Sequence, residues 1–322
     1  MKLNSSKMMF LMMMITSTIM MMASNNMILS WMSMEINLIS FMPLMTKSKK
    51  LNDQTMKYFI IQSLASSTML MSILMNSTFE APIEMSIMLM TSMLMKIGLM
   101  PFHMWMPNLM QSLEWNTCML MMTWQKISPV IFTSQMINLY SLTIPMYMSL
   151  LLAPMVGMKQ TAYSKILAYS SIANSPWMIL SSKISKTNFY YFMMIYSMMN
   201  IVLMLTLKKN NMIFMNQMNP MSKFTKMMFM IMMLSISGMP PMMGFMPKWM
   251  ILQSYIDKML VMSMMMISSS MISTFIYIKM MYPMMMTSST KKFINSIKEM
   301  KLMNFMLMNV MTLPMMLILK MF

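Results

Sequence analysis

The sequence predicts an all-α polytopic membrane protein with about eleven transmembrane helices. Of its 322 residues, 58% are hydrophobic and only 10% are charged, whereas a soluble domain carries roughly 25% charged residues. Apolar windows long enough to cross the ~30 Å hydrocarbon core of a bilayer recur along the whole chain. The chain therefore lacks the polar surface that a soluble protein of this length needs.

Eleven apolar windows make up most of the chain. The first, near 8–23, follows Lys2 and Lys7 and superficially resembles a secretory signal. Because it is longer than the apolar region of a signal and leads directly into further windows, we expect a retained first helix. The others lie near 27–46, 55–76, 84–110, 112–138, 140–158, 162–181, 188–208, 224–257, 259–282 and 302–321.

The fourth and ninth windows are longer than a bilayer requires, and each contains residues that interrupt a helix. In the fourth window, Gly98 and Pro101 closely follow Lys96. In the ninth, the segment 237–244 contains two glycines and two prolines and lies just ahead of Lys248. Such residues free backbone polar groups near the middle of the membrane. A charge beside a broken helix suits an ion or proton pathway, whereas a plain anchor helix needs neither feature.

The two broken helices indicate an internal repeat. Residues 1–138 and residues 139–282 each form a unit of five predicted helices in which the broken helix comes fourth. Because each unit has an odd number of helices, the second unit crosses the membrane in the opposite sense. Inverted repeats with broken helices are typical of many secondary transporters. Residues 283–322 add an inner-side loop and a C-terminal transmembrane helix.

The distribution of lysine predicts the orientation. With eleven crossings, thirteen lysines gather on the side of the amino terminus, and the other side has chiefly four lysines together with Glu80, Glu84 and Asp257. By the positive-inside rule, the amino terminus faces the inner compartment, either cytoplasm or mitochondrial matrix. The thirteen are Lys2, Lys7, Lys47, Lys49, Lys50, Lys159, Lys208, Lys209, Lys223, Lys291, Lys292, Lys298 and Lys301; the four are Lys183, Lys186, Lys258 and Lys320.

The composition argues against several other functions. The net charge of +17 comes mostly from lysines in short loops, with no continuous basic stripe, so nucleic-acid binding is not expected. One cysteine and one histidine cannot hold an iron–sulfur cluster, a zinc ion or a bis-histidine haem. The 74 methionines replace other apolar residues in every window, which favours a filler role over copper binding. We therefore expect this chain to bind no metal and no redox cofactor.

Four ionisable residues inside the apolar windows are the candidate site: Glu35, Lys96, Lys126 and Lys248. An ionisable residue within a membrane span is costly unless it faces a cavity or a partner, so it is a candidate functional residue. Each of the four could instead reach the interface or belong to a structural ion pair. An acid and a base that stabilise each other's charge can form a proton relay, and this is the interpretation we prefer.

Other polar residues receive more ordinary interpretations. We expect Lys165 at the membrane interface and His103 as a donor to a carbonyl freed by the first helix break. Glu80, Glu84 and Asp257 are expected to be loop or interface charges. The polar side chains that could hold water between ionisable groups, or join helices, are Asn37, Gln125, Ser170 and Ser171.

The chain resembles the subunit 2 family of the mitochondrial NADH:ubiquinone oxidoreductase, respiratory complex I, which is antiporter-like. Several motifs in the same order carry this resemblance across most of the chain. They are Met34-Glu35-Ile36-Asn37 with Pro43 and Thr46-Lys47, Lys57-Tyr58-Phe59, Lys96-Ile97-Gly98 with Pro101-Phe102-His103, Thr123-Trp124-Gln125-Lys126, Lys165-Ile166-Leu167-Ala168-Tyr169-Ser170-Ser171, Gly238-Met239-Pro240-Pro241 with Gly244-Phe245, and Pro247-Lys248-Trp249. The segment Asn174-Ser175-Pro176-Trp177 departs from the family's His-Met-Gly-Trp, so no proton role is carried to position 174.

The resemblance implies a core subunit of the complex I membrane arm that helps to move protons across the inner mitochondrial membrane. It implies that Glu35, Lys96, Lys126 and Lys248 match the family's buried chain of proton-pathway residues. It further implies that NADH, FMN, iron–sulfur clusters and ubiquinone belong to other subunits. The partners would be other core and accessory subunits and phospholipids, with the amino terminus in the matrix.

Two alternatives remain open at this stage. A free-standing cation/proton antiporter would share the inverted repeat and the buried lysines, although the chain lacks several buried acids for a metal cation. A purely structural subunit that spaces neighbouring pumps would contain the same residues.

Overall fold

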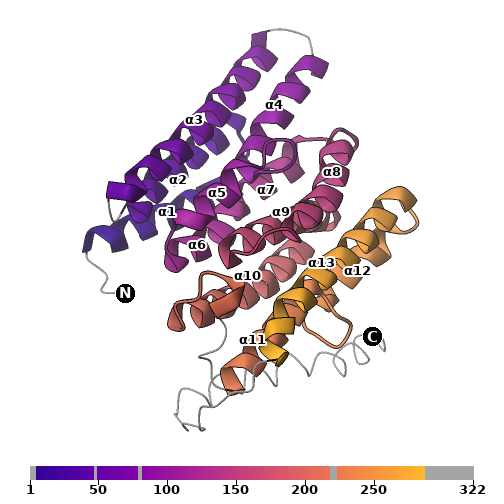
Figure 1. Ribbon diagram of the computed structural model, residues 1–322. Helices are drawn as coiled ribbons and strands as arrows, with labels where there is room; N and C mark the ends of the chain where they lie inside the picture. Colours follow the sequence, from indigo (N-terminus) through magenta and orange to yellow (C-terminus); the bar gives the residue numbers. More distant parts are fainter. Residues whose placement is uncertain (1–4, 47–48, 79–81, 218–222, 287–322) are drawn as a thin grey trace. The chain divides into compact units, whose positions relative to one another are not determined.

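The computed structural model describes residues 5–46, 49–78, 82–217 and 223–286, and these are almost entirely helical (Figure 1). The described residues form thirteen α-helices and one short 3₁₀ helix. The predicted last helix near 302–321 lies outside the described residues. The chain divides into two compact units, residues 1–149 and 150–322.

Unit 1 is a bundle built around α7. Its helices are α1 (Ser5–Ala23), α2 (Met27–Met45), α3 (Lys49–Thr78), α4 (Pro82–Ile97), α5 (Trp105–Ser112), α6 (Trp115–Met122) and α7 (Trp124–Met136). Consecutive helices pack in pairs, α1 on α2, α2 on α3 and α3 on α4, while α7 packs against α1, α2 and α4. This central position explains why the side chains of α7 between Lys126 and Thr133 are mostly buried.

Unit 2 is centred on α9. Helix α8 (Leu139–Gly157) spans the boundary between the units and is followed by α9 (Tyr163–Ile184), α10 (Lys186–Lys209), η1 (Met215–Gln217), α11 (Lys223–Ser237), α12 (Phe245–Tyr255) and α13 (Leu260–Met286). Helix α9 packs against α10, α12 and α13. Most of its residues are buried, including Trp177 with 2% of its surface exposed.

Six described helices are long and apolar enough to cross a membrane, which establishes a polytopic membrane protein. They lie at Ser5–Ala23, Met27–Met45, Asp53–Asn76, Leu139–Gly157, Lys186–Lys209 and Leu260–Pro283. The number of eleven crossings stays a prediction. Part of the difference has a simple cause: the two long predicted windows are split into shorter helices, of which Ser86–Ile97 and Thr225–Ser237 are apolar but short.

The two predicted helix breaks are present, after α4 and after α11. Gly98 has φ +76° and Gly238 has φ +84°, a left-handed conformation that a residue with a Cβ atom adopts only with strain. After each glycine, the next amide reaches back five residues to a leucine carbonyl: Leu99 N to Leu94 O at 3.0 Å, and Met239 N to Leu234 O at 3.3 Å. This is the Schellman-type ending of a helix.

The window 112–138 was predicted as one helix, and this prediction was wrong. The structure divides it at Thr123, between α6 and α7. The Thr123 hydroxyl donates to the Met119 carbonyl oxygen at 2.7 Å, beside the Thr123 amide that donates to the same oxygen at 3.1 Å. A threonine that bonds back to the preceding turn competes with the backbone ladder and bends the helix.

Candidate functional site

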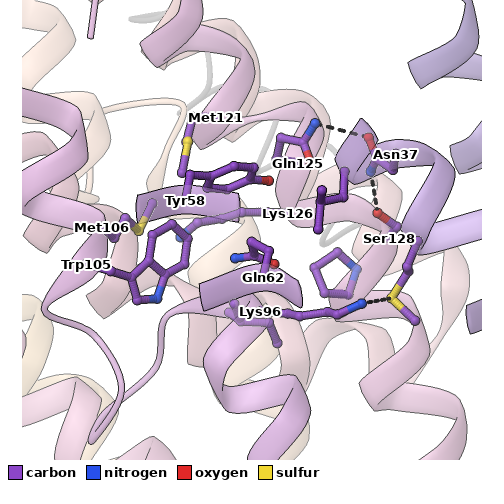
Figure 2. A pocket seen from close by; sticks show the side chains of 14 residues that line it. Asn37, Tyr58, Gln62, Lys96, Trp105, Met106, Met121, Gln125, Lys126 and Ser128 are labelled. Carbon is purple, nitrogen blue, oxygen red and sulfur yellow. Dashed lines mark hydrogen bonds between the residues drawn. The ribbon is translucent and has the colours of Figure 1, made fainter. Parts of the chain in front are cut away.

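Lys96 and Lys126 line one cavity in unit 1 (Figure 2). Lys126, from α7, is almost fully buried, with 3% of its surface exposed. Lys96 comes from the last turn of α4, and the helix break that begins at Gly98 follows it directly. The packing of α7 against α4 brings the two lysines to the same space. Two of the four predicted site residues therefore share a site.

The cavity is polar and narrow. The volume in which the centre of a water molecule can lie is about 40 Å³. One water needs roughly 10–15 Å³ of such volume, so a few waters fit. Its other lining residues come from helices α2 to α7: Met34, Asn37, Leu38, Tyr58, Gln62, Ile97, Trp105, Met106, Met121, Gln125, Ser128 and Pro129. The site thus combines two bases with amides, hydroxyls and an indole, groups that can hold water in a defined orientation.

A row of hydrogen bonds fixes one wall of the cavity. The Gln125 side-chain amide donates to Asn37 Oδ1 at 3.0 Å, and Asn37 Nδ2 donates to Ser128 Oγ at 3.1 Å (Figure 2). Gln125 Nε2 also lies 3.3 Å from the sulfur of Met14. These bonds join α7 to α2 and α1, and they hold Gln125 and Ser128, which lie one residue before and two residues after Lys126. Asn37 and Gln125 were expected to hold water or to join helices, and the structure places them in the second role.

Lys96 contacts a different residue of the cavity lining. Its Nζ atom lies 4.0 Å from the sulfur of Met34, a weak acceptor. Glu35, the neighbour of Met34, is close enough for its charge to interact with that of Lys96. Glu35 is half-buried and is not among the cavity-lining residues. The carboxyl therefore acts on the lysine from outside the cavity and does not form part of its wall.

Lys248 lies in unit 2, at the second helix break. Its Nζ atom donates to the carbonyl oxygens of Ser237 at 2.9 Å and Ile236 at 3.4 Å, and it lies 5.6 Å from the centre of the Trp177 ring. The break after Ser237 leaves these carbonyls without a helical partner, so the ammonium group caps the end of α11. Gly238 is packed against the lysine, because a Cβ atom there would lie 2.9 Å from Lys248 Cδ.

The structure also locates the other polar residues. His103 Nδ1 lies 3.2 Å from the Pro101 carbonyl oxygen, in agreement with the expected contact to a freed carbonyl. Lys165 is half-buried near the start of α9, and Asp257 is exposed in the turn between α12 and α13. The side chains of Glu80 and Glu84 lie outside the described residues. Within the described part of the chain, no group of three metal-ligating residues occurs.

Sequence reasoning missed several residues of the site. These are Tyr58, Gln62 and Trp105, which line the cavity. Sequence reasoning also missed a buried lysine outside the site: Lys226 in α11 has 4% of its surface exposed and lines neither the cavity of Lys96 and Lys126 nor those next to Lys248. Tyr58 and Gln62 are four residues apart and share one face of α3, a spacing that could have signalled a common surface. Trp105 gave no such signal, because its position depends on the turn that follows Gly98.

The fold and site define a polytopic helical membrane protein whose buried bases lie at broken helices, the class that moves ions across membranes. A family profile described as NADH:quinone oxidoreductase/Mrp antiporter, transmembrane, matches residues 24–276. The chain belongs to this family. It is 39% identical over 286 residues to NADH-ubiquinone oxidoreductase chain 2 of Locusta migratoria, covering 85% of this chain and 84% of the relative. It is 33% identical to the same-named chain of Latimeria chalumnae, covering 81% and 80%.

Solved structures show the same fold at low sequence identity. A chain of respiratory complex I from Thermus thermophilus with bound aureothin superposes with a TM-score of 0.81 at 16% identity, covering 90% of this chain and 72% of that one. A chain of the Mrp complex from Dietzia sp. superposes with a TM-score of 0.76 at 13% identity, covering 88% and 61%.

Proposed function

We propose that the chain is a core membrane-arm subunit of respiratory complex I. In this role it takes part in proton translocation across the inner mitochondrial membrane, coupled to electron transfer from NADH to ubiquinone. The observation that carries the proposal is the shared polar cavity of Lys96 and Lys126, at a helix break in a chain whose relatives are named NADH-ubiquinone oxidoreductase chain 2. As a subunit of that enzyme it would hold no redox centre of its own, and the redox cofactors would be carried by partner subunits.

The proposed pathway uses the four residues in distinct roles. Glu35 modulates the charge of Lys96, because the carboxyl group is close enough to interact electrostatically with the lysine. Lys96 passes a proton through water in the cavity to Lys126, whose position is held by the Gln125–Asn37–Ser128 wall. Lys248 leads toward an exit in unit 2. Each step moves one proton from a lysine ammonium to water and from water to the next base.

The inverted repeat also remains part of the proposal, with five-helix units 1–138 and 139–282 and an additional segment 283–322. Its support is a matched pattern around the two breaks. Gly98, Pro101 and Pro107 recur 140 residues later as Gly238, Pro241 and Pro247. Trp105 and Phe245, each the first residue of the helix after the break, follow the same spacing. The units would then cross the membrane in opposite senses, with the amino terminus in the matrix.

The partners we propose are other core and accessory subunits of the membrane arm, together with phospholipids. Large apolar side chains are exposed along several described helices, including Ile19 on α1, Leu64 on α3 and Met271 on α13. In a membrane these side chains face lipid or neighbouring subunits.

A second candidate is a free-standing cation/proton antiporter, favoured by the fold shared with the Mrp complex. Gentle solubilisation of the native membranes, separation on a native gel and mass spectrometry distinguish the two. Comigration with flavin and iron–sulfur subunits in a large NADH-oxidising assembly is the expected result. Migration alone or as a small oligomer would favour the antiporter and lead to ion-exchange assays in vesicles.

A further inference from the structure

A group of buried polar side chains lies beside Lys248 in unit 2, outside the cavity of Lys96 and Lys126. It consists of Tyr196 and Asn200 on α10 and Tyr277 on α13, which expose 6%, 0% and 1% of their surfaces. The two tyrosine hydroxyls and Asn200 Oδ1 have no hydrogen-bond partner among the described residues. Buried polar atoms in native proteins are paired with protein groups or with ordered water, because an unpaired atom loses its hydration without compensation. Three such atoms in one group indicate a site for water.

Two small cavities connect this group to Lys248. One is lined by Lys248, Asn174 and Tyr277, together with serines of α9 and α13. The other is lined by Lys248, Asn174 and Tyr196. They offer about 10 Å³ and 20 Å³ to water centres, which is room for about one water each. Lys248 and Asn174 belong to both cavities, so the lysine has access to each tyrosine.

The two tyrosines also lie close to each other. Tyr196 interacts electrostatically with Tyr277, and the nearby polar side chains are Asn200 and Ser171 at Tyr196 and Ser170 at Tyr277. A tyrosine hydroxyl can donate one hydrogen bond and accept another at the same time. The pair can therefore continue a chain of hydrogen bonds that begins at the water next to Lys248.

The group lies between Lys248 and one end of unit 2. At that end the Tyr163 amide donates to the Ile213 carbonyl at 3.0 Å, so the start of α9 meets the segment after α10. Lys279 on α13 donates to the Met158 carbonyl at 3.2 Å, so the end of α13 lies there too. From the helix rise, Tyr277 is about 3 Å along α13 from Lys279 and about 14 Å from Met286, the last residue of that helix, and Tyr196 is about 20 Å along α10 from Lys209. The polar group thus extends from the lysine toward this end.

We propose that Tyr277 and Tyr196, with water bound beside them, form a branch that carries protons between Lys248 and the end of unit 2 at Tyr163, Lys209 and Lys279. Each hydroxyl passes its proton to the next acceptor as it takes one from the previous donor, so one proton moves and both tyrosines end neutral. This proposal rests on the proton-translocating function proposed above. By the lysine distribution, the branch opens on the inner side.

The test uses the assembled complex in sealed vesicles, with proton uptake measured against NADH oxidation. Tyr277→Phe and Tyr196→Phe remove only the hydroxyls, singly and together. Tyr255→Phe is the matched control, because Tyr255 is buried at 6% exposure and its hydroxyl donates to the Leu180 carbonyl oxygen at 3.3 Å, yet it lines neither cavity next to Lys248. We expect each single variant to slow pumping by about 2- to 12-fold, the factor that corresponds to one net hydrogen bond, with Tyr255→Phe close to the parent.

The variant Lys248→Met shows whether a negative result refutes only the tyrosine branch or also the proposed proton-carrying role of Lys248. If Lys248→Met slows pumping but the double tyrosine variant matches Tyr255→Phe, the branch is overturned and the proposed function stands. If an assembled complex with Lys248→Met pumps protons at the parent rate, Lys248 does not carry protons, and the proposed tyrosine branch is refuted as well. A density map of the complex supplies a second readout, with ordered water expected at both hydroxyls; direct packing of apolar side chains against them would contradict the proposal.

Discussion

Gly238→Ala is expected to damage the second lysine site through two separate effects. The backbone effect is the left-handed φ of +84°, which costs a residue with a Cβ atom roughly 1–2 kcal/mol. The contact effect is the 2.9 Å approach of the new Cβ atom to Lys248 Cδ. The lysine side chain is flexible, so it moves, and its hydrogen bond to the Ser237 carbonyl lengthens. A hydrogen bond to a charged group contributes about 1.5–3 kcal/mol, so the total loss lies between about 1 and 5 kcal/mol.

The measurement is the temperature at which the chain leaves the complex on native gels, together with proton pumping at a permissive temperature. Gly157→Ala is the matched control, since Gly157 does not have a left-handed φ and a Cβ atom there would lie 3.3 Å from Tyr169 Cβ and 3.6 Å from Ile276 Cδ1. Lys248→Ala removes the clash but not the backbone strain, so the double variant should lose less stability than the two single variants added together. Strict additivity, or pumping by Gly238→Ala at the rate of Gly157→Ala, would refute the contact between glycine and lysine.

Two further predictions concern the first site. Asn37→Leu should lower the stability of unit 1 by about 1–4 kcal/mol, because it removes the oxygen that accepts from Gln125 and the amide that donates to Ser128 in the protein interior; thermal release of the chain from the complex measures this, and a loss no larger than that of an exposed variant such as Ser67→Leu would contradict it. Glu35→Gln should slow pumping several-fold without loss of assembly, because it removes the charge that acts on Lys96; equal pumping by the variant and the parent would exclude this role for the carboxyl.

The sequence was sufficient to predict the helical membrane class and the two main breaks, for a physical reason. Gly98 and Gly238 adopt a backbone conformation that glycine supplies without strain, and the nearby prolines cannot continue a helix, so the break is encoded locally. The bend at Thr123 was missed because a threonine hydroxyl that bonds to the previous turn leaves no such mark in the sequence.

The site was predictable only where charge marked it. Lys96 and Lys126 are conspicuous among apolar residues, and both line the cavity. Tyr58, Gln62 and Trp105 were missed because whether an uncharged side chain in a helix lines a cavity depends on which helix packs against it. The sequence alone does not show that packing. The capping of α11 by Lys248 was hidden for a similar reason: its partners are backbone carbonyls, which every residue carries.

The central claim is that the buried lysines of unit 1 carry protons, and Lys126→Met tests it most directly. Methionine preserves the length and apolar stem of the side chain and removes the base. Lys226→Met is the matched control, because Lys226 is equally buried at 4% exposure but lines neither lysine site. In reconstituted, fully assembled complex, the account predicts that Lys126→Met lowers proton pumping coupled to NADH oxidation while Lys226→Met keeps it. Parent-level pumping by an assembled Lys126→Met complex would contradict the account and favour a structural subunit.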